Sequence, residues 1–301
     1  MRQLFLQSDY RDPGTVLGWF RGRSHIGRSM SGHQPAFDPT DLAALARARD
    51  LAITAAAAPR DAILAHFRSA ELATEIKPDG SPVTPADLEA EIAIRARLRA
   101  SAEFGGFAIL GEEAGLAGEA TPYRWIVDPI DGTRAFVRGL PTFGTIVALE
   151  ETASARAVVG VIHLPATGET LAAARGLGAV ADGRPLRVSR AKNLRSAIVS
   201  LPDLIEFRAA GMEGAYRAIH AACDRVRGYT DCWAHAQVIG GAVDALVDPA
   251  LSPWDVRATE VLVTEAGGGC RLRASRLDGK VDLICGSPAL VAEIAELIGL
   301  A

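Results

Sequence analysis

Helical and strand-like hydrophobic patterns alternate along the chain, and the first of them is helical. Alanine, leucine and isoleucine dominate residues 38–68, where Asp38 followed by proline is predicted to begin a helix and Pro59 to break it. A polar loop, KPDGSPVTPAD, then ends in a second start signal, with Thr84 as the N-cap and Asp87 as the third residue after it. Helical segments are therefore expected before the first long strand.

Strand-like runs fill the middle of the chain, and both element types alternate after it. Strands are predicted over residues 107–113, 124–128, 143–149, 155–163 and 170–174. Further strands are expected at residues 196–201, 224–227, 245–248 and 282–285, with helices at residues 213–222, from 232, after 254 and from 288. This order predicts one layered α/β domain over residues 30–301, built from two halves of about 30–190 and 191–301.

Composition and charge exclude several classes of partner. The chain has 301 residues, 49% of them hydrophobic and 23% charged, which is typical of a globular domain. A formal net charge of -4 and the lack of a long Lys/Arg run argue against nucleic acid or an anionic membrane as a partner. No apolar run approaches the roughly 20 residues that span a bilayer. The four cysteines lack the paired spacing of a zinc site and are interpreted as reduced thiols, so a cytoplasmic location is predicted.

The first 29 residues differ from the rest of the chain. They contain five arginines, two aspartates and a short apolar patch at residues 16–20, which is too brief for a secretory signal. We interpret residues 1–29 as a disordered leader or as the product of a misassigned start codon, with Met30 as the true start.

The stretch WIVDPIDGTRAF, residues 125–136, places two aspartates around a proline directly after an apolar run. Two such charges about 4 Å apart repel by roughly 4 kcal/mol at an effective dielectric constant of 20, so a cation is expected between them. The proline is predicted to turn the chain sharply, so that Asp128, Asp131 and the carbonyl of Ile130 converge. The backbone amides of Gly132 and Thr133 are predicted to bind a phosphate.

Further carboxylates stand at the ends of other predicted elements. Glu112 and Glu113 follow the strand at residues 107–113, and Asp255 lies far downstream in SPWDVRATEV. Oxygen ligands of this kind suit magnesium, which retains waters that exchange with a substrate phosphate. No histidine lies near these stretches, so zinc is not expected. Turn and cap residues are the alternative interpretation; it fits Glu113 or Asp79 alone but not the set.

Three motifs together resemble the inositol monophosphatase superfamily of magnesium-dependent phosphatases. They are GEE at residues 111–113, WIVDPIDGT at 125–133 and WDVRATEVLVTEAGG at 254–268. The resemblance extends from about residue 38 to residue 301. It implies a sugar-phosphatase fold of α-β-α-β-α layers, two or three Mg²⁺ ions, a small phosphorylated metabolite as substrate and usually a homodimer.

The resemblance also implies which residues hold the metal ions. Glu112, Asp128 and the Ile130 carbonyl would bind a first Mg²⁺, and Asp128, Asp131 and Asp255 a second. Independently of the family, metal ions can lower the pKa of a bound water and neutralise the charge on phosphoryl oxygens during monoester hydrolysis.

The catalytic and phosphate-binding residues are implied in the same way. Asp87 with Glu112 would bind a weaker third ion through water, and Thr133 would hydrogen-bond Asp87 to orient the attacking water. The amides of Gly132 and Thr133 would contact the phosphate.

The stretch RGYTDCWAH, residues 227–235, is most similar to the bacterial histidinol-phosphatase branch, where Arg-Gly-Tyr-Gly-Asp is usual and Thr230 is a departure. This implies hydrolysis of histidinol phosphate, a step of histidine biosynthesis. Asp231 would pair with a cationic group of that substrate, which inositol phosphate lacks; the alternative is that Asp231 caps the following helix. Glu260 is a weaker candidate for the same contact.

Other functions stay open at this point. They are an inositol-phosphate or broad-specificity sugar-phosphate monophosphatase, a bisphosphate nucleotidase, and a metal-dependent regulatory protein without catalysis. Magnesium-dependent phosphate release separates the last of these from the enzymes.

Overall fold

The computed structural model describes residues 37–299, so the predicted leader at residues 1–29 and the predicted start at Met30 lie outside the described part of the chain. An eight-stranded sheet comes first, with the order β10-β9-β8-β7-β6-β5-β3-β4; β3 and β5 are parallel and the other neighbours antiparallel. Its strands are β3 (Ala108–Gly111), β4 (Gly115–Ala117), β5 (Tyr123–Asp131), β6 (Gly144–Glu151), β7 (Arg156–Leu164), β8 (Glu169–Ala174), β9 (Ala179–Ala181) and β10 (Arg184–Pro185). The central strands β5 to β7 are buried along almost their whole length, as their continuous apolar runs require.

The N-terminal helices are α1 (Leu42–Ala57), α2 (Arg60–His66) and α3 (Pro85–Arg99). The predicted break at Pro59 is confirmed, because Pro59 separates α1 from α2. The predicted start at Asp38 was wrong: Asp41 caps α1 by accepting from the amide of Ala43. Asp38 instead accepts from the amide and hydroxyl of Thr40, which closes a turn before the helix. The predicted capping box at Thr84 is confirmed.

The second sheet has five strands in the order β12-β11-β13-β15-β14. They are β11 (Ile198–Ser200), β12 (Arg225–Arg227), β13 (Ala245–Leu251), β14 (Gly269–Ala274) and β15 (Val281–Gly286). The helices of this part are α5 (Leu204–Ala209), α6 (Glu213–Ala222), α7 (Asp231–Ile239), α8 (Pro253–Glu265) and α9 (Pro288–Leu297). The first sheet ends at Pro185 and the second begins at Ile198; the division into halves near residue 190 stays a prediction.

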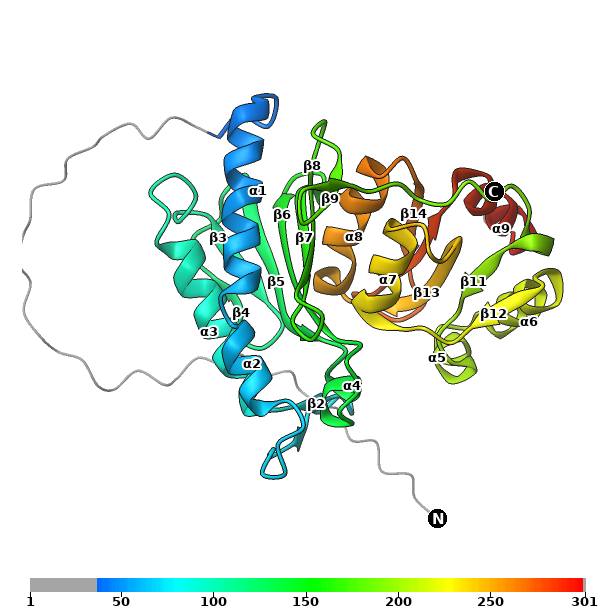
Figure 1. The fold of residues 1–301 in the computed structure, drawn as a ribbon, viewed down its shortest axis with the longest axis horizontal. Helices are drawn as coiled ribbons and strands as arrows, with labels where there is room; N and C mark the ends of the chain where they lie inside the picture. Colours follow the sequence, from blue (N-terminus) through cyan, green and yellow to red (C-terminus); the bar gives the residue numbers. More distant parts are fainter. Residues whose placement is uncertain (1–36, 300–301) are drawn as a thin grey trace, which may run out of the picture. The chain divides into compact units, whose positions relative to one another are not determined.

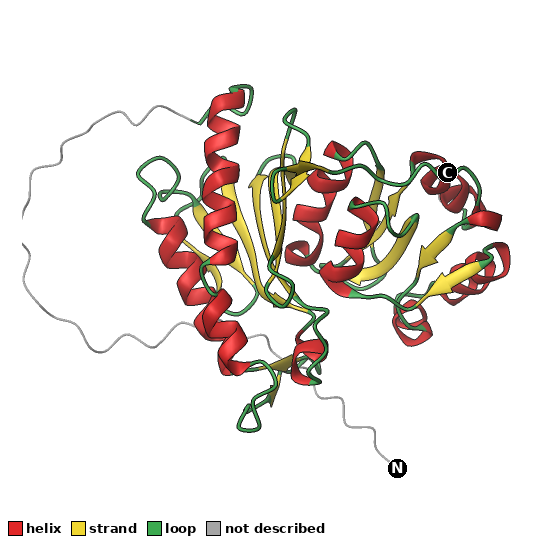
Figure 2. Cartoon of the chain, viewed as in Figure 1, coloured by secondary structure: helices red, strands yellow, loops and turns green. Residues whose placement is uncertain are grey.

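The elements of residues 37–299 stack in five layers (Figure 1). Helices α1 and α3 pack on the outer face of the first sheet, and α7 and α8 lie between the two sheets. Helices α5, α6 and α9 cover the remaining face of the second sheet, and Figure 2 shows the same succession of helices and strands. The predicted α-β-α-β-α layering is confirmed.

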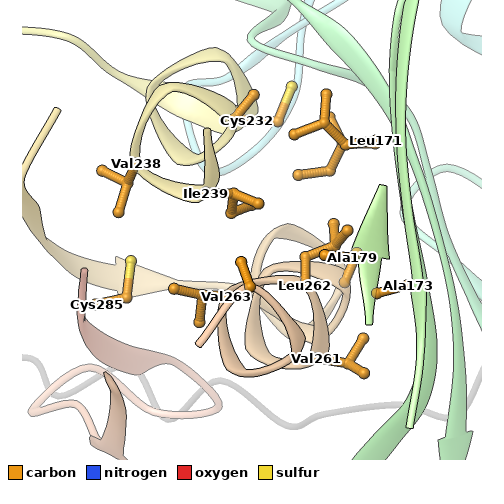
Figure 3. Close-up of a cluster of buried hydrophobic side chains, with 14 of the residues drawn as sticks. Leu171, Ala173, Ala179, Cys232, Val238, Ile239, Val261, Leu262, Val263 and Cys285 are labelled. Atoms are coloured by element: carbon orange, nitrogen blue, oxygen red, sulfur yellow. The ribbon is translucent and has the colours of Figure 1, made fainter. Parts of the chain in front are cut away.

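The middle layer is fixed by a dry core between the sheets (Figure 3). Leu171 of the first sheet, Ile239 of α7, Leu262 of α8 and Cys285 of the second sheet meet there. Burial of each large aliphatic side chain contributes about 1.5–3 kcal/mol. At Gly160 a Cβ atom would lie 2.6 Å from a backbone oxygen of α8, so glycine is what lets this helix pack directly on β7. The core therefore holds α8, which carries a predicted metal ligand, in a defined position.

The hydrophobic pattern does not predict several elements, most of them short. These include β1 (Glu75–Ile76), β2 (Pro82–Val83), α4 (Thr133–Val137), η1 (Leu194–Ser196) and α5, together with β4, β9, β10 and the edge strand β14. Short elements at edges and in loops carry too few residues to show a period. None of the helices within residues 37–299 combines the length and apolar character needed to cross a bilayer.

Candidate metal centre and active site

Three aspartates from two elements meet at one point. Each of Asp128 and Asp131 in β5 and Asp255 in α8 offers a carboxylate oxygen, and these three oxygens lie within 4.8 Å of one another. Asp128 is buried, whereas Asp131 and Asp255 are partly exposed. We call these residues, with Glu112 and Asp87, the acid cluster.

A β-bulge explains why both aspartates of β5 face the same point. The pairing of β5 with β6 shifts between Asp128 and Asp131, so that Pro129 and Ile130 together lie opposite Thr145 alone. In a regular strand, side chains three positions apart point to opposite faces, and the extra residue of the bulge cancels that difference. The hydroxyl of Thr145 donates to the Pro129 carbonyl at 2.8 Å and holds the bulge. The predicted sharp turn was wrong, because the strand continues through the proline.

Parallel strands bring Glu112 to the cluster. Glu112 directly follows β3, and its amide donates to the Val127 carbonyl of β5 at 3.1 Å, one residue before Asp128. Lys77, in the turn between β1 and β2, donates to Oε1 of Glu112 and to Oε1 of Glu113, both at 2.7 Å. Burial raises the pKa of Glu113 to about 7, although the hydrogen bond from Lys77 opposes the rise.

Asp87 lies at the start of α3 and is held by its own helix cap. Its Oδ2 accepts from the amide of Thr84 at 2.8 Å and from the Thr84 hydroxyl at 2.7 Å. Its Oδ1 lies 3.3 Å from the hydroxyl of Thr133, which also reaches the Ile130 carbonyl at 2.9 Å. One hydroxyl proton serves only one of these acceptors at a time. The structure thus brings Asp87, Thr133 and Ile130 together, as the sequence predicts.

Asp255 is held in the same way at the start of α8. The Ser252 amide donates to Asp255 Oδ2 at 2.7 Å, and the reciprocal contact from the Ser252 side chain completes a capping box. The same capping arrangement therefore occurs twice, in Thr84-Pro-Ala-Asp87 and in Ser252-Pro-Trp-Asp255. Each begins a helix with a hydroxyl cap and a proline, and each fixes one oxygen of an aspartate that belongs to the acid cluster.

The acid cluster is electrostatically incomplete without a cation. Burial raises the pKa of Asp128 well above its usual value, and the charges of Glu112, Asp131 and Asp255 raise it further. Burial also raises the pKa of Asp131 strongly, and that of Asp255 to about 7. Oδ1 of Asp128 is buried and has no hydrogen-bond partner within residues 37–299. A buried carboxylate oxygen without a partner is costly, and a set of oxygen donors alone fits a hard divalent cation.

Asp231 lies beside the acid cluster, at the first position of α7. Its backbone is left-handed, with φ 58°, and Thr230 rather than Asp231 is the N-cap, so the interpretation of Asp231 as a helix cap was wrong. Its carboxylate accepts from the Thr230 hydroxyl at 2.6 Å, and its Oδ2 would lie 3.3 Å from a Cβ added at Gly132. The next amide, that of Cys232, donates to Asp131. The first turn of α7 therefore bonds to the acid cluster through the Cys232 amide and lies beside Gly132, the predicted phosphate-binding residue, through Asp231.

Two further acids interact electrostatically with this region: Asp248, which is buried and lies 3.3 Å from Nε2 of His235, raises the pKa of Asp231, and Asp231 in turn acts on Glu206. We call Asp231, Asp248 and Glu206 the acidic rim. Burial raises the pKa of Asp231, the charge of Asp248 adds to this, and His235 and Arg134 oppose it. Burial raises the pKa of Glu206 to about 7, with contributions from Asp248 and Asp231. Negative charge is thus concentrated next to the acid cluster on three different elements.

Three residues that contact this region were not predicted from the sequence. They are Lys77, Ser252 and the buried Glu91, which accepts from the amides of Glu113 and Ala114 at 2.8 and 3.1 Å. Repetition of the hydroxyl-Pro-x-Asp pattern is the sequence signal that could have identified Ser252. Glu260 is not in this region: it is buried and pairs with Arg156 and Arg257, so its interpretation as a substrate contact finds no support.

Comparison with known proteins supports the resemblance of the motifs. The chain matches the inositol monophosphatase family over residues 44–298. It is 35% identical to a histidinol-phosphatase of Chlorobaculum parvum over 239 residues, which are 78% of this chain and 90% of that protein. It is 39% identical to a histidinol-phosphatase of Mycobacterium tuberculosis over 218 residues, covering 71% and 81% of the two chains. An inositol-1-monophosphatase of Mesorhizobium japonicum is 34% identical over 226 residues, covering 71% and 79%.

Solved structures agree with the fold. The extragenic suppressor protein suhB of Bartonella henselae superposes with a TM-score of 0.75 at 27% identity, covering 84% of this chain and 98% of that one. An inositol monophosphatase of Thermotoga maritima gives 0.71 at 28% identity, with 83% and 96% covered. The matched residues include the bulged strand and both capped aspartates, and with them the chain belongs to the inositol monophosphatase family of metal-dependent phosphatases.

Proposed function

We propose that the protein is a Mg²⁺-dependent histidinol-phosphatase, in which the acid cluster holds two or three ions. Glu112, Asp128 and the Ile130 carbonyl would bind one ion, and Asp131 and Asp255 would share Asp128 with another. The buried Oδ1 of Asp128 supports this assignment, because it is the atom that gains most from a bound cation. When bound, the ions lower the pKa of water and neutralise the phosphoryl oxygens.

The residues of the chain itself position the reactants. Asp87 accepts a proton from the attacking water through Thr133, whose hydroxyl lies between Asp87 and the Ile130 carbonyl. The amides of Gly132 and Thr133 contact the phosphate. Glycine suits this position, because Gly132 has φ +84° and a Cβ there would lie 3.0 Å from the Thr142 carbonyl oxygen.

The observation that carries the choice of substrate is the carboxylate of Asp231 against Gly132. A phosphate held at Gly132 places its ester group next to the acidic rim. An ammonium or imidazolium on that group gains a charge-assisted hydrogen bond from Asp231, whereas a neutral polyol offers that carboxylate no opposite charge. The left-handed backbone of Asp231 supports a functional role, since strain of about 1–3 kcal/mol per residue is concentrated at functional sites.

The test is phosphate release with Mg²⁺ from histidinol phosphate, inositol 1-phosphate and adenosine 3′,5′-bisphosphate at equal concentration. We expect histidinol phosphate to be preferred by roughly a hundredfold in kcat/KM, equivalent to about 2.7 kcal/mol of transition-state discrimination. Asp231→Asn is expected to lower kcat/KM for histidinol phosphate by at least about tenfold and to leave inositol 1-phosphate nearly unchanged.

Asp224→Asn, an exposed acid next to β12, is the control and is expected to change neither substrate. A flat profile, or a preference for inositol 1-phosphate, would favour a broad-specificity or inositol-phosphate monophosphatase with the same metal chemistry. No phosphate release from any ester would contradict the enzymatic proposal itself. We also propose a cytoplasmic location and a homodimer. The four cysteines are free thiols, which agrees with a cytoplasmic location because disulfides are rare there.

A further inference from the structure

Lysine is rare in this chain and is concentrated at the acid cluster. Only three of its 32 Lys and Arg residues are lysines: Lys77, Lys192 and Lys280. Lys77 contacts the predicted ligand Glu112 and its neighbour Glu113, and Lys280 contacts the cap of the Asp255 helix. Two of the three lysines therefore serve one site, while arginine carries nearly all other positive charge.

Lys77 is held firmly against the two glutamates. Its side chain is 18% exposed, and those of Glu112 and Glu113 are 20% and 7% exposed. Its ammonium is therefore shared between two carboxylates and is largely shielded from solvent. Its turn is closed by a bond from its amide to the Ser81 carbonyl at 2.8 Å.

Lys280 approaches the same cluster from the other half of the chain. It precedes β15, and its ammonium donates to the hydroxyl of Ser252, which caps the helix that carries Asp255. The amide of the same Ser252 donates to Oδ2 of Asp255 at 2.7 Å, so a single residue bridges the ammonium of Lys280 and a carboxylate of the acid cluster. The two lysines thus flank the acid cluster from two separate turns.

The choice of lysine has a physical reason. An ammonium is a compact point charge on a flexible stem, and it can release one partner without breaking a planar bidentate geometry. A divalent cation bound at Glu112 needs the same carboxylate that Lys77 occupies. An arginine fork would hold that carboxylate more rigidly.

We propose that Lys77 and Lys280 are built-in counter-cations of the acid cluster, which stabilise its charge and compete with divalent metal ions for it. Lys77 competes directly at Glu112, and Lys280 acts at longer range through the field at Asp255. The inference rests on the proposed metal site. It assigns the two lysines a role in setting metal affinity, separate from any contact with substrate.

The test compares Lys77→Met, Lys280→Met and the control Lys192→Met, in which the changed lysine lines a groove at the start of α9 without any acid-cluster carboxylate. Mg²⁺ binding is measured by calorimetry on the chelator-treated full chain, and the melting temperature is measured in EDTA and in saturating Mg²⁺. We expect Lys77→Met to bind Mg²⁺ about three- to tenfold more tightly and to melt at a lower temperature in EDTA, with a smaller difference in Mg²⁺. We expect Lys280→Met to change the Mg²⁺ affinity and the melting temperature in EDTA in the same directions, but by less. Lys192→Met is expected to change neither quantity.

The sign of the affinity change decides between counter-cation and structural roles. Unchanged or weaker Mg²⁺ binding by Lys77→Met, with equal losses of melting temperature in EDTA and in Mg²⁺, would show a structural ion pair and overturn the inference. Lys77→Arg keeps the charge and must not bind Mg²⁺ more tightly than the wild type. If the wild type itself shows no saturable Mg²⁺ binding, the proposed metal site fails, and the counter-cation role fails with it.

Discussion

At the scale of single residues, Asp128 is the side chain on which stability and activity make opposite demands. It is 1% exposed, four other carboxylates raise its pKa, and its Oδ1 has no hydrogen-bond partner within the described chain. A residue selected for stability would not be charged here, because burial of an uncompensated charge costs several kcal/mol. The position fits a group that the proposed cation would complete.

Asp128→Asn is expected to separate the two demands. Loss of the shared ligand lowers turnover with Mg²⁺ by about two orders of magnitude or more, while removal of like-charge repulsion keeps or raises the melting temperature in EDTA. Phosphate release and thermal unfolding check the two halves of this expectation. Asp61→Asn is the control, because the side chain of Asp61 is 98% exposed and Asp61 is distant from Asp128 in the sequence. Near-normal turnover in Asp128→Asn would show that Asp128 is not a metal ligand.

At the scale of elements, a buried ion network fastens α8 to the first sheet. Glu150 of β6 is fully buried and bonds to Arg124 of β5 at 2.8 Å and to Arg257 of α8 at 2.7 Å. Arg257 also approaches Glu260, which pairs with Arg156 of β7. The helix that carries Asp255 is therefore held by charge as well as by the core shown in Figure 3.

We expect Glu150→Gln to destabilise the fold by about 3 kcal/mol, because it leaves two arginines without their buried partner. Chemical denaturation measures the change. Glu213→Gln is a matched control: Glu213 also bonds two arginines, Arg208 and Arg217, but on an exposed surface, so its substitution should change little. Equal losses in the two variants would show that burial of the Glu150 network has no special importance.

At the scale of the whole molecule, a buried histidine links global stability to pH. His163 in β7 is 3% exposed, its Nδ1 lies 2.9 Å from the Thr170 hydroxyl, and its Nε2 has no hydrogen-bond partner within residues 37–299. Burial lowers the pKa of His163 from 6.5 to about 4; the charge of Arg60 adds to this and Asp182 opposes it. Between these two pH values the unfolded chain binds the proton and the folded chain does not. Stability is therefore lost as the pH falls from about 6.5 towards 4.

His163→Gln is expected to remove about 3 kcal/mol of this pH dependence relative to the wild type, because each pKa unit corresponds to 1.36 kcal/mol. Denaturation curves between pH 7 and pH 4 test the expectation, and the difference between the two proteins isolates His163 from carboxylates that titrate in the same range. His220→Gln, on the exposed side of α6, is the control. If the free energy of unfolding changed equally with pH in His163→Gln and in the wild type, this prediction would be wrong.

Local signals explain what could be predicted. The capping box at Thr84, the break at Pro59 and the buried central strands each depend on residues close together in sequence. The layered fold follows from the order of these elements and from the motif resemblance. The ligand residues stand at ends of strands and helices, where a motif of nine or fifteen residues is enough to name them.

What local signals could not supply is relative position. The bulge at Pro129 depends on the register of β5 against β6, and the contacts of Lys77 and Lys280 join residues more than 25 positions apart. Asp231 acquires its neighbours only when α7 packs beside the acid cluster. The sequence by itself determined the family, most of the longer elements and the set of acids, because those follow from local preference and motif. Only the tertiary structure decided which charges face one another, because electrostatic energy depends on distance in space and not on distance along the chain.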